Sequence, residues 1–74
     1  MEQLISILKD IDPDIDYENE KHLIDDGLLD SMQVLELVST LEDEFDIEVT
    51  PTELVPANFN SADSMWAMIQ RLKG

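Results

Sequence analysis

The residues of this sequence that could support chemistry gather at Asp30-Ser31-Met32, where an amphipathic helix is expected to begin. Asp30 suits the N-cap position, because its carboxylate can accept hydrogen bonds from the unpaired backbone N–H groups of the first turn. Ser31 then lies in that turn, at the positive end of the helix dipole. An anion is stabilised there, so a phosphate ester on the Ser31 hydroxyl would be well placed.

Ser31 lacks the surroundings of a catalytic nucleophile. Such a role needs an activating base within hydrogen-bond reach and a third group that orients the base. The chain has one histidine, His22, and no Gly-x-Ser-x-Gly elbow surrounds the serine. The sequence therefore argues against a serine hydrolase. A serine that is merely polar at a helix start stays open on these residues alone.

The helix expected from Ser31 to about Phe45 is amphipathic. Its apolar residues are spaced three or four apart, the interval that brings side chains to one face of a helix. The apolar face would consist of Leu35, Val38, Leu41 and Phe45, and for Leu35 an exposed contact beside the serine and a core position are both open. The opposite side would carry Glu36, Glu42, Asp43 and Glu44.

One helix and a long loop are expected before it. Apolar spacing predicts a helix over residues 2–11, which Pro13 ends because the residue before a proline avoids the helical region. Its apolar stripe would be Leu4, Ile5, Leu8 and Ile11, with Ile7 at the edge. Residues 12–29 would form an ordered loop in which Gly27 supplies backbone freedom. The expected loop anchors in the core are Ile15, Tyr17, Leu23, Ile24, Leu28 and Leu29.

A turn and a short helix are expected after the acidic helix. Thr52 would cap the short helix through Glu53–Val55, and Pro56 would end it. The predicted core anchors of this region are Ile47, Val49 and Phe59.

The last helix is expected after Ser61, whose hydroxyl suits an N-cap. Its inner face would consist of Ala62, Met65, Trp66, Ile69 and Leu72. Three main helices, one short helix and a long first loop predict an all-α fold, a small four-helix bundle, with residues 1–74 forming a single domain.

The composition restricts the possible functions. The chain has 74 residues, a hydrophobic content of 43% and a formal net charge of −14. So strong a negative charge argues against binding to nucleic acid or to an anionic membrane surface, and it favours basic protein partners. There is no cysteine, no apolar run of membrane-spanning length and no recognisable signal peptide, so a cytoplasmic protein is expected.

Alternating acidic residues in the first loop raise the question of a calcium site. They are Asp10, Asp12, Asp14, Asp16, Glu18 and Glu20. The EF-hand pattern fails in every frame, because the glycine at its sixth position is absent and no frame also ends in glutamate at its twelfth. A solvated acidic loop is predicted instead of a metal site.

The stretch around Ser31 resembles the acyl carrier protein family. Asp30-Ser31-Met32, at the head of an apolar and acidic helix, is similar to the signature at which these proteins carry 4′-phosphopantetheine, and the likeness continues through Val34–Val38 and Leu41–Asp46. The resemblance implies a four-helix carrier fold, with the arm transferred from coenzyme A to Ser31 by a phosphopantetheinyl transferase. Acyl or aminoacyl intermediates would be held on the arm as thioesters for partner enzymes, and the domain itself would not be an enzyme.

The residues before Ser31 depart from the fatty-acid carrier pattern Leu-Gly-x-Asp-Ser-Leu. Leu28 occupies the glycine position, Gly27 lies one place earlier and Met32 replaces the leucine. The run Gly27–Met32 is more similar to the D-alanyl carrier proteins of teichoic acid modification and to some stand-alone carriers of peptide or polyketide pathways. The resemblance implies a loading ligase and leaves the cargo open.

Charge around Ser31 predicts a surface for partner enzymes. No lysine or arginine occurs between Lys21 and Arg71, so this region is expected to present a negative field that steers basic partners. The predicted interface consists of Asp30, Met32, Leu35, Glu36, Glu42 and Asp43. The protein is expected to be a monomer. The alternative function is an acidic protein-interaction module without a prosthetic group, and a calcium-binding protein is a third hypothesis.

Overall fold

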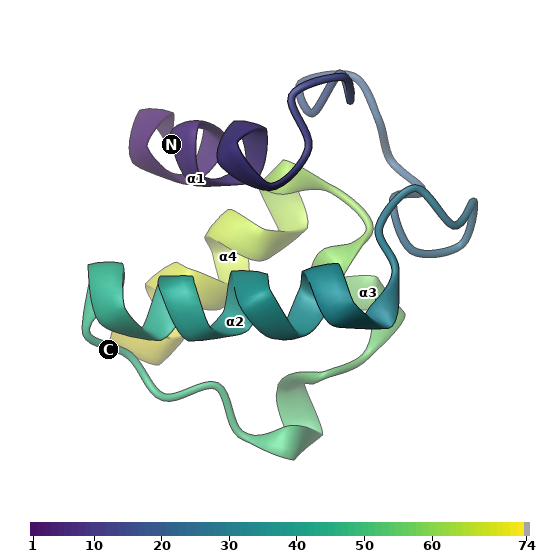
Figure 1. The fold of residues 1–74 in the computed structure, drawn as a ribbon. Helices are drawn as coiled ribbons and strands as arrows, with labels where there is room; N and C mark the ends of the chain where they lie inside the picture. The colour runs from purple at the N-terminus through teal and green to yellow at the C-terminus, as the bar shows by residue number, and fades with distance from the viewer. Residues whose placement is uncertain (74) are drawn as a thin grey trace.

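The computed structural model describes residues 1–73, and within them every regular element is helical (Figure 1). The elements are α1 (Glu2–Ile11), α2 (Ser31–Phe45), the 3-10 turn η1 (Pro51–Glu53), α3 (Pro56–Phe59) and α4 (Ala62–Lys73). In Figure 1, α1 and α2 lie across the molecule, α4 packs behind them, and the long first loop joins α1 to α2 at one side. The predicted all-α bundle is confirmed. No helix in this described part of the chain is long and apolar enough to cross a membrane.

α1 has the predicted bounds, but its buried face is rotated from the predicted one. The core residues of α1 are Leu4, Ile7 and Leu8. Ile7 was predicted at the edge of the face, and this was wrong because Ile7 is buried. Ile5 and Ile11, predicted for the centre of the face, are only half-buried. Residues 4, 7, 8 and 11 form one helix face by their spacing, and Ile5 lies beside that face.

α2 also has the predicted bounds, and its buried face corrects the prediction. The core residues of α2 are Leu37, Val38, Leu41 and Phe45. Leu35, for which a core position and an exposed contact were both open, is 58% exposed, and Leu37, which was not predicted for the core, is fully buried. The cause is that five of the seven residues from Met32 to Val38 are apolar, which covers more than one helix face and leaves the choice of face to packing against α1.

The first loop is fixed to the bundle by buried side chains. The Tyr17 hydroxyl donates to backbone carbonyl oxygens of the end of α1, at 2.9 Å from Leu8 and 2.8 Å from Asp12. The anchors that are buried or half-buried as predicted are Ile15, Tyr17, Leu23, Ile24 and Leu29. Leu28 was a wrong prediction, because it is 38% exposed while its neighbour Leu29 faces the core.

The short third helix lies further along the chain than predicted. Thr52 lies inside η1 instead of capping a helix, and Pro56 begins α3 instead of ending the helix before it. Proline suits the first position of a helix, where its missing N–H would have no partner in any case. The core anchors confirmed in this region are Ile47, Val49 and Phe59.

α4 has the predicted cap, because the Ser61 hydroxyl oxygen accepts the Ser64 backbone N–H at 3.0 Å. The core residues of α4 are Ala62, Met65, Met68 and Ile69, to which Trp66 and Leu72 add half-buried side chains. The Trp66 ring meets Phe45 of α2 edge-on, with ring centroids 5.9 Å apart and 75° between the planes. Met68, at 1% exposure, is a core residue of α4 together with Met65.

Candidate functional site

The first turn of α2 is closed by a reciprocal pair of hydrogen bonds. The Asp30 carboxylate accepts the Gln33 backbone N–H at 2.8 Å, and the Gln33 side-chain oxygen accepts the Asp30 backbone N–H at 3.0 Å. This capping box satisfies two donors that a helix start otherwise leaves unpaired. The Asp30 cap was predicted from the sequence, and the role of Gln33 was not. The signal was available in the Asp-x-x-Gln spacing.

The chain reaches this cap through a tight turn at Gly27. Gly27 has a φ of +72°, a left-handed conformation that favours glycine, which confirms its predicted role. Beyond it, the backbone N–H groups of Leu28 and Leu29 both donate to the Leu23 carbonyl, at 2.9 and 3.0 Å. Because Leu23 and Leu29 are buried, the residues just before α2 are held against the core.

Ser31 is exposed on the first turn of α2. Within the described residues 1–73, the hydrogen bonds of this turn are made by Asp30 and Gln33, and none engages the Ser31 hydroxyl. The serine therefore combines three properties: an accessible oxygen, a backbone fixed by the capping box, and a place at the positive end of a 15-residue helix. These properties suit a hydroxyl that another enzyme esterifies with a phosphate.

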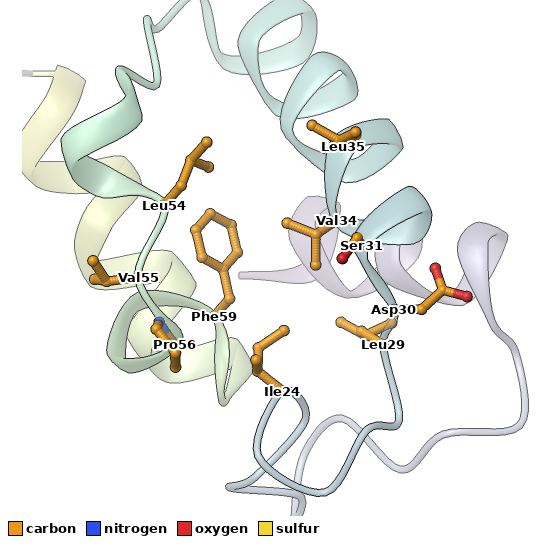
Figure 2. A pocket seen from close by; sticks show the side chains of 10 residues that line it. All are labelled: Ile24, Leu29, Asp30, Ser31, Val34, Leu35, Leu54, Val55, Pro56 and Phe59. Carbon is orange, nitrogen blue, oxygen red and sulfur yellow. The ribbon is translucent and has the colours of Figure 1, made fainter.

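A pocket of about 330 Å³ opens beside Ser31. Figure 2 shows the residues of α2 on one side of it, Leu54 and Val55 on the other, and Phe59 between them. The lining is mostly apolar and is formed by Ile24, Leu29, Asp30, Ser31, Val34, Leu35, Leu54, Val55, Pro56 and Phe59. Sequence reasoning missed the far wall, Leu54 and Val55, because these residues come from a segment 20 or more positions away in the chain.

Exposed apolar side chains are concentrated around this serine. The large hydrophobic residues exposed in the described part of the chain are Met1, Leu28, Met32, Leu35, Leu54 and Val55. All but Met1 either line the pocket or lie within three residues of Ser31. Met32 and Leu35, at 75% and 58% exposure, are the most open of them. Clustering of this kind is typical of a surface that contacts another protein.

The predicted interface residues lie on the exposed side of α2, with one qualification of role. By helix geometry Met32, Glu36 and Asp43 form one row along α2, and Leu35 and Glu42 form the neighbouring row. Glu42 is half-buried, and its Oε2 atom accepts the Val49 backbone N–H at 2.9 Å. Glu42 therefore also fixes the turn that follows α2.

No group of three or more His, Cys, Asp or Glu side chains that could hold a metal ion occurs among residues 1–73. The acidic residues of the first loop instead make local contacts, such as the Asp14 backbone N–H to the Asp12 carboxylate at 3.0 Å. Beside Ser31 the pocket instead offers an exposed serine and mostly apolar walls.

Comparisons with known proteins agree with this geometry. Residues 2–69 match the family described as "Phosphopantetheine attachment site". The D-alanyl carrier protein of Lactococcus lactis subsp. lactis is 30% identical over 74 residues, covering 97% of this chain and 94% of the relative. The D-alanyl carrier protein of Leuconostoc mesenteroides is 32% identical over 74 residues, with coverage of 99% and 95%. A probable acyl carrier protein, PigG, of Serratia is 34% identical over 56 residues, with coverage of 76% and 64%.

Proposed function

The chain belongs to the phosphopantetheine attachment site family, as a carrier protein that tethers intermediates on a covalent 4′-phosphopantetheine arm, and we propose that Ser31 is the residue that bears the arm. The observation that carries this proposal is the exposed Ser31 hydroxyl on a first turn fixed by the Asp30–Gln33 capping box. A phosphodiester at this position would be stabilised by the N-terminal end of the α2 dipole.

The arm supplies the thiol on which an acyl or aminoacyl group is held as a thioester. The chain itself contains no cysteine, so this chemistry has to come with the arm. The task left to the chain's own residues is presentation: Asp30 and Gln33 hold the first turn, and the apolar pocket gives a partner a shaped surface next to Ser31. The domain is therefore not an enzyme in this proposal.

D-alanine is the cargo that the available observations favour. Two of the relatives described above are D-alanyl carrier proteins that align along nearly the whole chain. The run Gly27–Met32 also has the glycine placement that resembles those carriers rather than fatty-acid carriers. A ligase that activates D-alanine is thus the proposed loading enzyme, because the cargo of a carrier is selected by the enzyme that loads it.

The partners are a phosphopantetheinyl transferase, the loading ligase and a downstream acyl-transfer enzyme, each with a basic docking surface. The proposed contact residues are Asp30, Met32, Leu35, Glu36, Glu42 and Asp43. Their charges would steer a basic partner toward Ser31, and the exposed Met32 and Leu35 would supply apolar contact. The protein is further proposed to act as a cytoplasmic monomer with residues 1–74 as one domain; Gly74 lies outside the described residues.

The experiment is an intact-mass measurement after incubation with coenzyme A, magnesium and a broad-specificity phosphopantetheinyl transferase. Wild-type protein is expected to gain the mass of one phosphopantetheine, and Ser31→Ala is expected to fold normally and gain none. Ser39→Ala is the matched control, because Ser39 is an exposed serine on the same helix. Loading of Ser31→Ala would contradict Ser31 as the attachment residue, whereas an unloaded but folded wild type would favour the acidic interaction module.

A further inference from the structure

The far wall of the pocket, Leu54 and Val55, lies in a segment without core anchors. Between Val49 and Phe59, which are 8% and 2% exposed, no side chain is buried. Leu54 and Val55 are 41% and 43% exposed, so the hydrophobic effect holds this segment mainly at its two ends. A further attachment would keep Leu54 and Val55 opposite α2.

A polar connection supplies this attachment. The Arg71 guanidinium of α4 donates to both carboxylate oxygens of Glu53, with Nη1 3.1 Å from Oε2 and Nη2 bonded to Oε1. Paired geometry of this kind is stronger and more directional than a single ion contact. The Arg71 and Glu53 side chains are 55% and 17% exposed, whereas those of the Lys21–Asp63 pair are 56% and 70% exposed, so the two pairs differ in the burial of the carboxylate. Arg71 is also the only arginine of the sequence.

Glu53 is also hydrogen-bonded to the segment that carries Leu54 and Val55. Its carbonyl oxygen accepts the Asn58 side-chain N–H at 2.8 Å and the Val55 backbone N–H at 2.9 Å. Its Oε1 atom accepts from Asn58 as well, at 3.2 Å. Leu54 follows Glu53 directly, and its backbone N–H donates to Pro51 at 3.1 Å. The ion pair thus connects α4 to Glu53, and the bonds around Glu53 connect the backbone from η1 to the start of α3.

We propose that Arg71, through its ion pair with Glu53, is a positioning residue that holds the wall Leu54–Val55 across the pocket from Ser31, so that partner enzymes meet a preformed surface (Figure 2). The part that concerns partner enzymes rests on the proposed function of Ser31. When the ion pair is lost, the wall samples other positions. A partner must then order the wall on binding, which weakens binding and leaves the chemical step unchanged.

The first test measures the wall directly by amide hydrogen exchange in Arg71→Gln. The Leu54, Val55 and Asn58 amides are expected to exchange about tenfold faster than in wild type, while the Leu41 amide of the core keeps its rate. Lys73→Gln is the matched control, because it removes the same charge from the same helix turn. Unchanged exchange at Leu54 and Val55 would overturn the proposal, and so would faster exchange throughout the core, which would mark Arg71 as a general stabiliser.

The second test measures recognition with the phosphopantetheinyl transferase. Arg71→Gln is expected to raise the KM for the carrier about fivefold with kcat unchanged, and Glu53→Gln is expected to act alike. Arg71→Lys keeps the charge without the paired geometry and should fall between wild type and Arg71→Gln. If Arg71→Gln showed faster exchange at Leu54 and Val55 but an unchanged KM, the claim that partner enzymes recognise a preformed wall would be overturned. A wild type that is never loaded at Ser31 would refute the proposed function, while the exchange measurement would still decide whether Arg71 holds the wall.

Discussion

The Asp30 carboxylate accepts the Gln33 backbone N–H at 2.8 Å, and the Gln33 side-chain oxygen accepts the Asp30 backbone N–H at 3.0 Å. This reciprocal pair spans Ser31 and Met32 and fixes the turn on which both are presented. The same two residues therefore stabilise α2 and orient the proposed attachment site. The two effects of Asp30 can be separated experimentally. Helix stability requires its acceptor oxygen, whereas the electrostatic attraction of a basic partner requires its charge.

Asp30→Ala is expected to lower the free energy of unfolding by about 1 kcal/mol, because it removes an N-cap acceptor. Asp30→Asn keeps an acceptor oxygen and is expected to retain most of that stability, yet to load more slowly because the charge beside Ser31 is gone. Urea unfolding and the initial rate of phosphopantetheinylation measure the two effects. Equal stability losses in both variants would show that the charge of Asp30 matters more than its hydrogen bond.

The exposed acidic row of α2 is expected to control association with basic partners. Glu36→Gln together with Asp43→Asn should lower the association rate with the transferase and flatten its dependence on salt, because both residues contribute to the steering field. The matched control is Asp14→Asn with Glu18→Gln, which changes the net charge equally on exposed residues of the first loop. Stopped-flow binding at low and high salt makes the comparison. If both double variants slowed association equally, net charge and not the α2 surface would be responsible.

Leu35 and Leu37, two positions apart on α2, are expected to have opposite roles. Leu37→Ala should cost about 3 kcal/mol of unfolding free energy, because Leu37 is fully buried and its truncation leaves a cavity. Leu35→Ala should leave stability almost unchanged, because Leu35 is 58% exposed, and should weaken recognition by the transferase. Thermal unfolding and loading kinetics on both variants test this. A large stability loss in Leu35→Ala would contradict the observed orientation of the helix.

The choice between these two leucines also marks the limit of what the sequence could predict. The bounds of α1 and α2 follow from local signals, the apolar period and the cap at Asp30, and both were correct. The face that α2 buries depends on contacts with a distant helix, and the apolar residues between Met32 and Val38 fit more than one face. The sequence therefore left Leu35 open between a core position and an exposed contact, and the burial of Leu37 was missed.

The candidate site was likewise predictable only in the part that is local in sequence. Ser31, its cap and its acidic neighbours are contiguous in sequence, so they could be recognised without a structure. The opposite wall could not, because Glu53 and Arg71 are 18 residues apart and nothing in either local sequence indicates the pairing. Pro56 illustrates a further difficulty, since a proline is compatible with the end of one helix and with the start of the next.

Tyr17 is expected to make the fold sensitive to alkali. Burial, with a contribution from the charge of Asp12, raises the pKa of Tyr17 from 10.0 to about 12. The unfolded chain would lose this proton first, so the stabilising effect is complete below pH 10 and is lost as the pH rises toward 12. Unfolding free energies across this pH range should fall for wild type and stay flatter for Tyr17→Phe. Tyr17→Phe should also lose about 1 kcal/mol near neutral pH, because the hydroxyl contacts to Leu8 and Asp12 are removed.

The position of the arm is the central claim, and fragmentation mass spectrometry of the loaded protein tests it most directly. The account predicts one phosphopantetheine per chain, carried only by the peptide that contains Ser31 and assigned to that residue by its fragment ions. An arm assigned to any of the other four serines, Ser6, Ser39, Ser61 or Ser64, would contradict the account.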